Sequence, residues 1–247
     1  MRSPRLWIAA AIVILGLLSY WAKRCVNPIT GETQHVALTA DQEIALGMES
    51  SSAMSQQFGG DDPETAVRTE VTAIGGNWYK PVMLGRRSTD SSFMHSMTHI
   101  PSMTLRCPGG PVFITRGLLN ELQNEGQLAG VLGHEIAHVV ARHAAEQMAK
   151  NQLAQMLVGA TAVAASDRDG HGNEAAMLAA FAAQMAQLRY GRKDELEADA
   201  LGVRIMSDAG YDPRALLGVM KILARTSRGG RQPEFLSTHP DPGSTKK

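Results

Sequence analysis

The first long apolar run lies near the N-terminus. Residues 6–22 contain no charged side chain, and basic residues flank this run on both sides. As a helix, these 17 residues extend about 26 Å, which is short but sufficient for a hydrocarbon core of about 30 Å. Trp7 near one end, and Tyr20 and Trp21 at the other, suit the two membrane–water interfaces. The pattern predicts an N-terminal transmembrane anchor or signal segment over residues 1–24.

Basic residues around this segment indicate its orientation. Arg2, Arg5 and the amino terminus precede the run, whereas Lys23 and Arg24 follow it. The more positive flank of a membrane helix stays in the cytoplasm, so the slight excess favours an inner-membrane anchor with the remaining chain in the periplasm. Secretion into the periplasm after signal cleavage is the alternative. Bulky aromatic residues stand where a cleavage site needs small ones, which favours the uncleaved anchor.

Turn signals and spacing divide the next part of the chain. Residues 25–38 contain Asn-Pro and Thr-Gly pairs and predict a linker. Thr39 and Gln42 have the spacing of a capping box, which predicts a helix to about residue 57. Residues 67–106 show no clear period and predict weak strands at most. Residues 111–115 are rich in β-branched and aromatic side chains and form the best strand candidate.

Helical periodicity dominates the second half of the chain. We expect helices at about 116–124, 126–150, 152–165, 173–189, 193–209 and 213–226, with a loop at 167–172. The alanine-rich segment 152–165 is too short to cross a bilayer and predicts a buried or membrane-facing helix. The expected fold class is α+β and predominantly helical, with a small β-sheet, in one domain over residues 39–247.

Composition excludes one class of function. The 247 residues suffice for one sizeable domain plus an anchor, and the formal net charge is zero. The chain has no basic stripe with interleaved aromatic residues, so we expect no nucleic-acid partner. Two cysteines, Cys25 and Cys107, do not make a disulfide framework.

The chemistry of the chain is concentrated in the run from His134 to His138, His-Glu-Ile-Ala-His. Histidines four residues apart lie on one helix face and can present two imidazoles to one metal ion. Glu135 stands beside the first histidine and can reach a water bound to that ion. This is the H-E-x-x-H arrangement of zinc peptidases, with the glutamate as general base. The alternative is two surface histidines on an amphipathic helix, which the apolar residues around them argue against.

An acidic segment downstream offers a third ligand. Glu195 and Asp199 are four residues apart and share one helix face. A zinc ion held by two histidines commonly takes a carboxylate as third ligand, which favours Glu195. Asp199 is spaced to accept a hydrogen bond from the free ring nitrogen of a ligand histidine, with His134 preferred. Glu197 is the weaker ligand candidate, and a solvated acidic helix is the alternative for the whole segment.

Other histidines carry weaker signals. His95 and His99 are also four apart but lack a nearby carboxylate, and His171 has no partner spacing. His143 follows His134 by nine residues, about 180° around a continuous helix. We therefore expect His143 to be a polar residue on the helix surface, unable to join the same metal ion.

H-E-x-x-H followed by E-x-x-A-D resembles the zinc metallopeptidase family that includes HtpX and the CaaX prenyl protease, and most of all its soluble, periplasmic BepA- and LoiP-like branch. Further matching stretches are residues 27–31, 42–47, 108–119, 128–133 and 237–240. The resemblance covers roughly residues 27–66 and 107–241, and the stretch 67–106 departs from the family pattern.

The resemblance implies a gluzincin-like metallopeptidase domain with one Zn²⁺ per chain on His134, His138 and Glu195, and with Glu135 as catalytic base. His239 resembles a family histidine that approaches the zinc, as an oxyanion stabiliser or a regulatory fourth ligand. The expected function is endoproteolysis of protein or peptide substrates, in the quality control of unfolded or misassembled envelope proteins. The alternative is a non-catalytic, zinc-stabilised chaperone-like binding protein, although such a protein has no need of Glu135.

Overall fold

The computed structural model describes residues 4–57, 59–82, 94–97, 104–106, 110–166 and 172–228. The chain divides into two compact units. The first contains residues 1–27, 31–37 and 145–191, and the second contains residues 28–30, 38–144 and 192–247. The predicted fold class is confirmed: the described chain is predominantly helical, with a small sheet and an N-terminal apolar helix.

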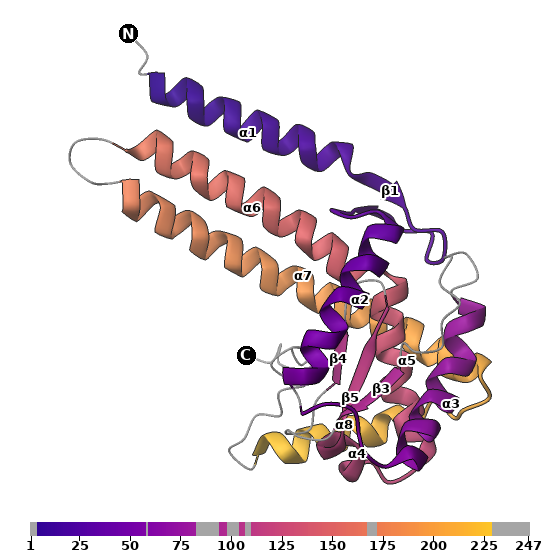
Figure 1. Cartoon of the computed structure of the whole chain (residues 1–247). Coiled ribbons are helices and arrows are strands. Elements are labelled where there is room, and N and C mark those ends of the chain that lie inside the picture. Colours follow the sequence, from indigo (N-terminus) through magenta and orange to yellow (C-terminus); the bar gives the residue numbers. More distant parts are fainter. Residues whose placement is uncertain are drawn as a thin grey trace. The chain divides into compact units, whose positions relative to one another are not determined.

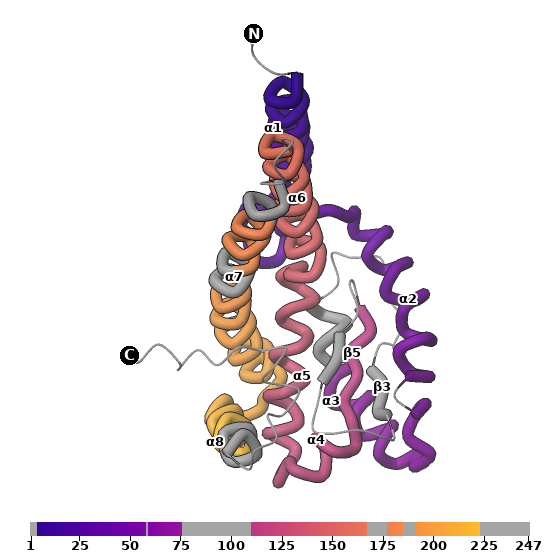
Figure 2. Tube along the Cα trace, turned by 90° about the vertical axis from the view of Figure 1, so that its left-hand side faces the viewer, coloured from indigo at the N-terminus to yellow at the C-terminus, as the bar shows by residue number. Residues whose placement is uncertain are grey.

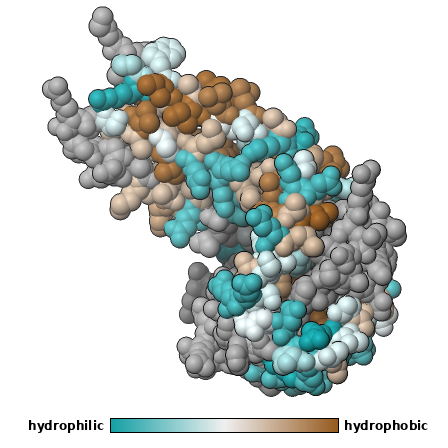
Figure 3. Space-filling model, in the orientation of Figure 1, coloured by the Kyte–Doolittle hydropathy of each residue, from teal (hydrophilic) through white to brown (hydrophobic). Residues whose placement is uncertain are grey.

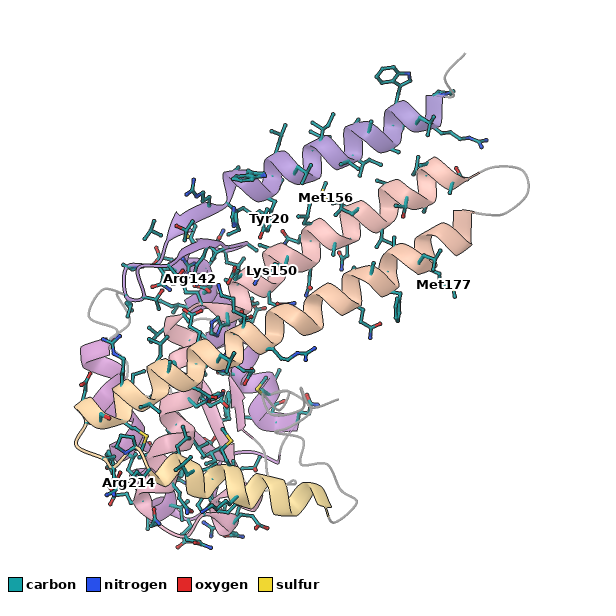
Figure 4. All side chains as sticks on the ribbon, turned by 180° about the vertical axis from the view of Figure 1, so that it is seen from behind. Tyr20, Arg142, Lys150, Met156, Met177 and Arg214 are labelled. Carbon is teal, nitrogen blue, oxygen red and sulfur yellow. The ribbon has the colours of Figure 1, made fainter. Side chains whose placement is uncertain are left out.

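Helices dominate the first unit. In Figure 1, α1 (Pro4–Ala22) runs alongside α6 (His143–Ala165), which is followed by the first part of α7 (Gly172–Asp208). A Cβ at Gly16 of α1 would lie 3.4 Å from the Met156 side chain of α6, which is van der Waals contact, so the two helices pack directly against each other here. Figure 4 shows Met156 between these two helices.

Two short strands occupy the segment that the sequence predicts as a linker. β1 (Arg24–Val26) pairs antiparallel with β2 (Thr33–His35). Gly31, with φ of 74°, closes the turn between them by donating its N–H to Asn27 O at 2.9 Å. The turn signals were therefore located correctly. The strands escaped prediction because three residues are too few to show a period.

A three-stranded sheet lies in the second unit. The order is β3 (Met94–Met97), β5 (Val112–Thr115) and β4 (Thr104–Arg106), with β3 parallel and β4 antiparallel to the central β5. All four residues of β5 are buried, which explains a run without polar alternation. The strand predicted at 111–115 is confirmed.

The helix α3 (Thr65–Val82) contradicts the weak strands predicted in the first part of residues 67–106. Val71 and Ile74, three residues apart, place one face of α3 in the core of the second unit. Adjacent glycines, Gly75 and Gly76, weaken the helical propensity of this segment. Tertiary packing of a narrow apolar face therefore decides its structure.

Helix α2 (Ala40–Gln57) begins where the sequence predicts. Thr39 Oγ1 accepts a hydrogen bond from Gln42 N at 3.2 Å, and Thr39 N donates to Gln42 Oε1 at 2.9 Å. This reciprocal pair is a capping box, and it confirms the predicted helix start.

The helix predicted over 126–150 is in fact two helices. α5 (Glu125–Val140) ends before Arg142, and α6 begins at His143. Arg142 has φ of 60°, which few residues other than glycine adopt. Its Nε donates to Glu43 Oε2 at 2.8 Å and its Nη2 donates to Leu38 O at 2.7 Å. The break escaped prediction because no glycine or proline marks it in the sequence, and because its partners lie about 100 residues away.

Replacing Arg142 with alanine is expected to lower the free energy of unfolding by about 3–5 kcal/mol, because the buried Glu43 carboxylate loses its guanidinium. Urea unfolding of the purified protein measures this difference. Arg214→Ala is the matched control, since the Arg214–Asp212 pair is exposed (85% and 52% of the two side chains) and should change stability little. Equal destabilisation by the two substitutions would show that the buried pair has no special role.

The remaining helices follow the sequence with one exception. α4 (Arg116–Glu121) and α8 (Ala215–Arg228) confirm two predictions. α7 is a single helix of 37 residues where two helices were predicted. Gly191 lies between the two predicted helices, but one glycine in a long helix costs only about 1 kcal/mol and is tolerated. The predicted loop at 167–172 lies almost entirely outside the described residues.

Candidate metal centre

Helix α5 carries two of the predicted ligands inside the second unit. Asn124 Oδ1 caps the helix by accepting from Gln127 N at 3.0 Å, and every residue from Gln127 to Val140 is buried. His134 and His138 are 4% and 1% exposed, and their Nε2 atoms lie 3.0 Å apart. The alternative of two surface histidines is therefore wrong.

Helix α7 brings a carboxylate to this imidazole pair. Glu195 Oε2 lies 3.4 Å from His134 Nε2, and Glu195 Oε1 lies 3.5 Å from His138 Nε2. Four-coordinate tetrahedral zinc with bonds of about 2.0–2.2 Å holds its ligand atoms about 3.3–3.6 Å apart. One donor atom from each residue lies within 4.8 Å of the other two. Both imidazole–carboxylate separations fall in this range, and only the 3.0 Å between the two Nε2 atoms is shorter. A small outward shift of one imidazole therefore fits these donors to a divalent zinc ion, with one position left for water or substrate.

Asp199 lies one turn beyond Glu195 on α7. Its Oδ1 is 3.0 Å from His134 Nδ1, so a proton on Nδ1 leaves the Nε2 lone pair of His134 facing Glu195 and His138. Burial lowers the pKa of His134, but the hydrogen bonds with Asp199 and Glu195 and the charge of Glu135 outweigh it and raise the pKa to about 9. The carboxylates around His134 thus favour a positive charge at this position. A bound metal ion would supply such a charge.

Glu135 follows His134 on α5 and is completely buried. Its negative charge is one of the causes of the raised pKa of His134, so its carboxylate lies within electrostatic reach of the imidazole. A buried carboxylate beside a metal site is suited to take a proton from a bound water.

His143 contradicts its prediction as a surface residue. It is 3% exposed, and its Nδ1 lies 2.8 Å from His138 Nδ1. Its Nε2 lies 3.5 Å from Glu197 Oε2. The prediction assumed one continuous helix, whereas the break at Arg142 turns His143 back toward the site. Periodicity alone could not reveal this contact.

The other histidines named above are not placed in the site. His95 belongs to β3, and His99, His171 and His239 lie outside the described residues. The roles suggested for them stay predictions.

A glycine allows α7 to approach α5. A Cβ at Gly202 would lie 3.0 Å from His134 N and 3.1 Å from His134 Cα. Gly202 follows Asp199 by three residues and Glu195 by seven, so all three lie on one face of α7. The missing side chain therefore lets the two carboxylates reach the imidazoles.

Gly202→Ala is expected to lower zinc affinity by about 10–100-fold, because the new methyl group moves the carboxylates of α7 away from His134. Competition with a chromophoric chelator measures the affinity. Gly191→Ala is the matched control in the same helix, since a Cβ there meets no atom within 4 Å. If the two variants bind zinc equally well, the close approach at Gly202 does not position the ligands.

The sequence model of Peptidase family M48 matches residues 103–244, more than half of the chain and the whole of the described metal centre. The chain belongs to Peptidase family M48. It is therefore a metalloendopeptidase, and its substrates are proteins. The matched range also leaves most of the divergent stretch 67–106 outside it.

Relatives of this M48 peptidase include mitochondrial and bacterial proteases. The chain is 28% identical to the mitochondrial metalloendopeptidase OMA1 of Schizosaccharomyces pombe, over 98% of this chain and 69% of that protein. It is 32% identical to the OMA1 of Arabidopsis thaliana over 54% of this chain and 26% of that protein. It is 34% identical to the beta-barrel assembly-enhancing protease of Escherichia coli strain K12 over 55% of this chain and 29% of that protein. The matches to the last two thus span less than a third of their length.

Proposed function

We propose that this M48 peptidase is a zinc-dependent endopeptidase that binds one Zn²⁺ through His134, His138 and Glu195 and uses Glu135 as its general base. The observation that carries the proposal is the convergence of three buried donor atoms within 4.8 Å of one another. The two imidazole–carboxylate separations suit tetrahedral zinc, and the chemistry of the family supplies the reaction class.

Zinc, when bound, acts as a Lewis acid on the scissile carbonyl and lowers the pKa of its bound water toward about 7. Glu135 takes a proton from the attacking water and later delivers a proton to the leaving amine. Asp199 accepts a hydrogen bond from His134 Nδ1 and thereby orients the ring. His239 remains the candidate for stabilising the negative charge that develops on the carbonyl oxygen.

We place the substrate in an extended conformation along the sheet edge near residues 105–115. β3 and β4 are the two edge strands of the described sheet, and β5 is paired on both sides, so β4 is the edge strand in this region of the chain. Main-chain hydrogen bonds to an edge strand select an extended conformation more than a sequence. Such selection suits unfolded or misassembled envelope proteins, and the similarity to the beta-barrel assembly-enhancing protease supports this class of substrate and a BepA- and LoiP-like assignment.

We infer that α1 anchors the peptidase in the inner membrane with its catalytic domain in the periplasm. Over Pro4–Ala22 the mean hydropathy is 1.7 with only 11% of the helix window buried, and Figure 3 shows apolar side chains gathered over this helix. In this proposal, residues 1–24 form the anchor, residues 25–38 the linker and residues 39–247 the peptidase domain. Full-length protein is expected to resist carbonate extraction from membranes, whereas release of the chain would favour signal cleavage and secretion.

The first unit also supports the membrane-facing alternative for residues 152–165. α6 runs beside α1, as the tube in Figure 2 also shows. Large apolar side chains of α6 and α7 are exposed. These are Leu157, Met177, Leu178 and Phe181, which are 36–75% exposed. We propose that they contact lipid. A polarity-sensitive fluorophore at Leu178→Cys, in a background with Cys25→Ser and Cys107→Ser, should shift to shorter wavelength in lipid vesicles, and an unchanged spectrum would refute the contact.

Zinc analysis combined with a cleavage assay tests the proposed function. We expect about one zinc per chain, cleavage of unfolded casein, loss of cleavage with 1,10-phenanthroline and its return when zinc is added back. Protein without zinc and without cleavage would overturn the proposal. Protein that binds zinc but does not cleave would favour the non-catalytic binding protein.

A further inference from the structure

Behind His138, on the side away from the other ligands, lie two further side chains. His143 Nδ1 is 2.8 Å from His138 Nδ1, and Glu197 Oε2 is 3.5 Å from His143 Nε2. We propose that Glu197 and His143 form a relay that fixes the tautomer of His138, which makes His143 a positioning residue of the peptidase. The inference rests on the proposed metal role of His138.

The hydrogen bond between the imidazoles of His138 and His143 restricts the positions of their protons. The two rings lie 4.8 Å apart between centroids, at an angle of 77°, and both residues are buried. Two ring nitrogens at 2.8 Å share one proton, so one of them donates and the other accepts. The direction of that bond decides which nitrogen of His138 keeps a lone pair.

Metal binding selects one direction. His138 Nε2 faces His134 and Glu195, so it must keep its lone pair to bind the ion. The proton of His138 then stays on Nδ1 and is donated to His143 Nδ1. His143 therefore carries its own proton on Nε2, which faces Glu197. In the reverse direction, His143 would donate and the proton of His138 would point into the metal position.

Glu197 completes the arrangement. The buried Nε2 of His143 makes no hydrogen bond within 3.5 Å in the described structure, and a buried N–H requires an acceptor. The Glu197 side chain is 22% exposed and can close the 3.5 Å separation by a small rotation. Helix α7 thus supports both imidazoles. Asp199 contacts His134 directly, whereas Glu197 acts on His138 through His143.

The break between α5 and α6 makes the relay possible. On one continuous helix, His138 and His143 would lie about 140° apart around the axis and could not bond. Arg142, with φ of 60° and an ion pair to Glu43, redirects the chain directly before His143. The Arg142–Glu43 ion pair therefore helps to orient a zinc ligand.

Two substitutions of His143 separate hydrogen bonding from packing. Asparagine places an acceptor oxygen near the position of Nδ1, whereas leucine has similar bulk and no acceptor. We expect His143→Leu to bind zinc about 10–100-fold more weakly than wild type, and His143→Asn to bind within about threefold of wild type. Competition with a chromophoric chelator gives the affinities, and urea unfolding of the metal-free proteins shows whether each variant folds. His35→Leu, in the other unit, controls for the loss of one imidazole.

NMR of the wild-type protein tests the relay even if His143→Leu fails to fold. Long-range ¹H–¹⁵N NMR of zinc-loaded wild type should show the proton of His138 on Nδ1 and that of His143 on Nε2. A His143 proton on Nδ1, or equal zinc affinities for the leucine variant and wild type, would overturn the relay alone. Equal loss in the leucine and asparagine variants would also overturn it. Wild type that binds no zinc would overturn the proposed function and the relay with it.

Discussion

Glu135→Gln is expected to lower kcat for casein cleavage by about 10²–10⁴-fold while zinc content stays at the wild-type level. The amide has the size of the carboxylate but cannot accept the proton of the attacking water. Because Glu135 is completely buried, a change of side-chain shape would disturb packing, whereas this substitution removes only the base. Steady-state cleavage of fluorescent casein, together with zinc analysis of the same samples, measures both quantities.

A control variant distinguishes loss of the general base from loss of any one negative charge. Glu146→Gln removes a carboxylate that pairs with Lys150 on the following turn of α6, and it should leave cleavage unchanged. Equal turnover by wild type and Glu135→Gln, or turnover by neither, would favour the non-catalytic binding protein.

Glu195→Ala is expected to remove zinc-dependent stabilisation. A ligand that binds only the folded state stabilises it by about 2.7 kcal/mol when its free concentration is 100 times Kd. Glu195 supplies one of the three converging donors, so its loss leaves two imidazoles, which hold zinc far more weakly. Addition of zinc should raise the melting temperature of wild type by several degrees and leave that of the variant almost unchanged.

The control for this experiment lies on the same helix. Asp208→Asn alters an exposed carboxylate at the end of α7, so it should keep the full zinc-dependent shift. If Glu195→Ala also keeps that shift, the third ligand is another group and the proposed centre is wrong.

Local chemistry explains where sequence reasoning succeeded. The capping box of Thr39 and Gln42 works within a few residues, and the apolar run at β5 reflects burial of both its faces. The spacing of His134 and His138 places two imidazoles on one helix face whatever surrounds the helix. The convergence of Glu195 on them could be anticipated, because the two motifs together match a known arrangement.

Distant partners explain where it failed. Arg142 takes a left-handed conformation because Glu43 and Leu38, about 100 residues earlier, hold its guanidinium. That break turns His143 from a predicted surface position into contact with His138. Helix α3 likewise forms in a segment with weak helical preference because Val71 and Ile74 pack into the core.

By itself, the sequence determined the types and spacing of the proposed ligands, the proposed general base and the apolar N-terminal helix, because these depend on side-chain chemistry and on the 3.6-residue turn. Only the tertiary structure decided the orientation of the ligands. The glycine that lets α7 approach α5, the break at Arg142 and the side chains behind each imidazole involve residues separated by up to about 100 positions. A local pattern cannot encode such contacts, since packing of the whole second unit brings them together.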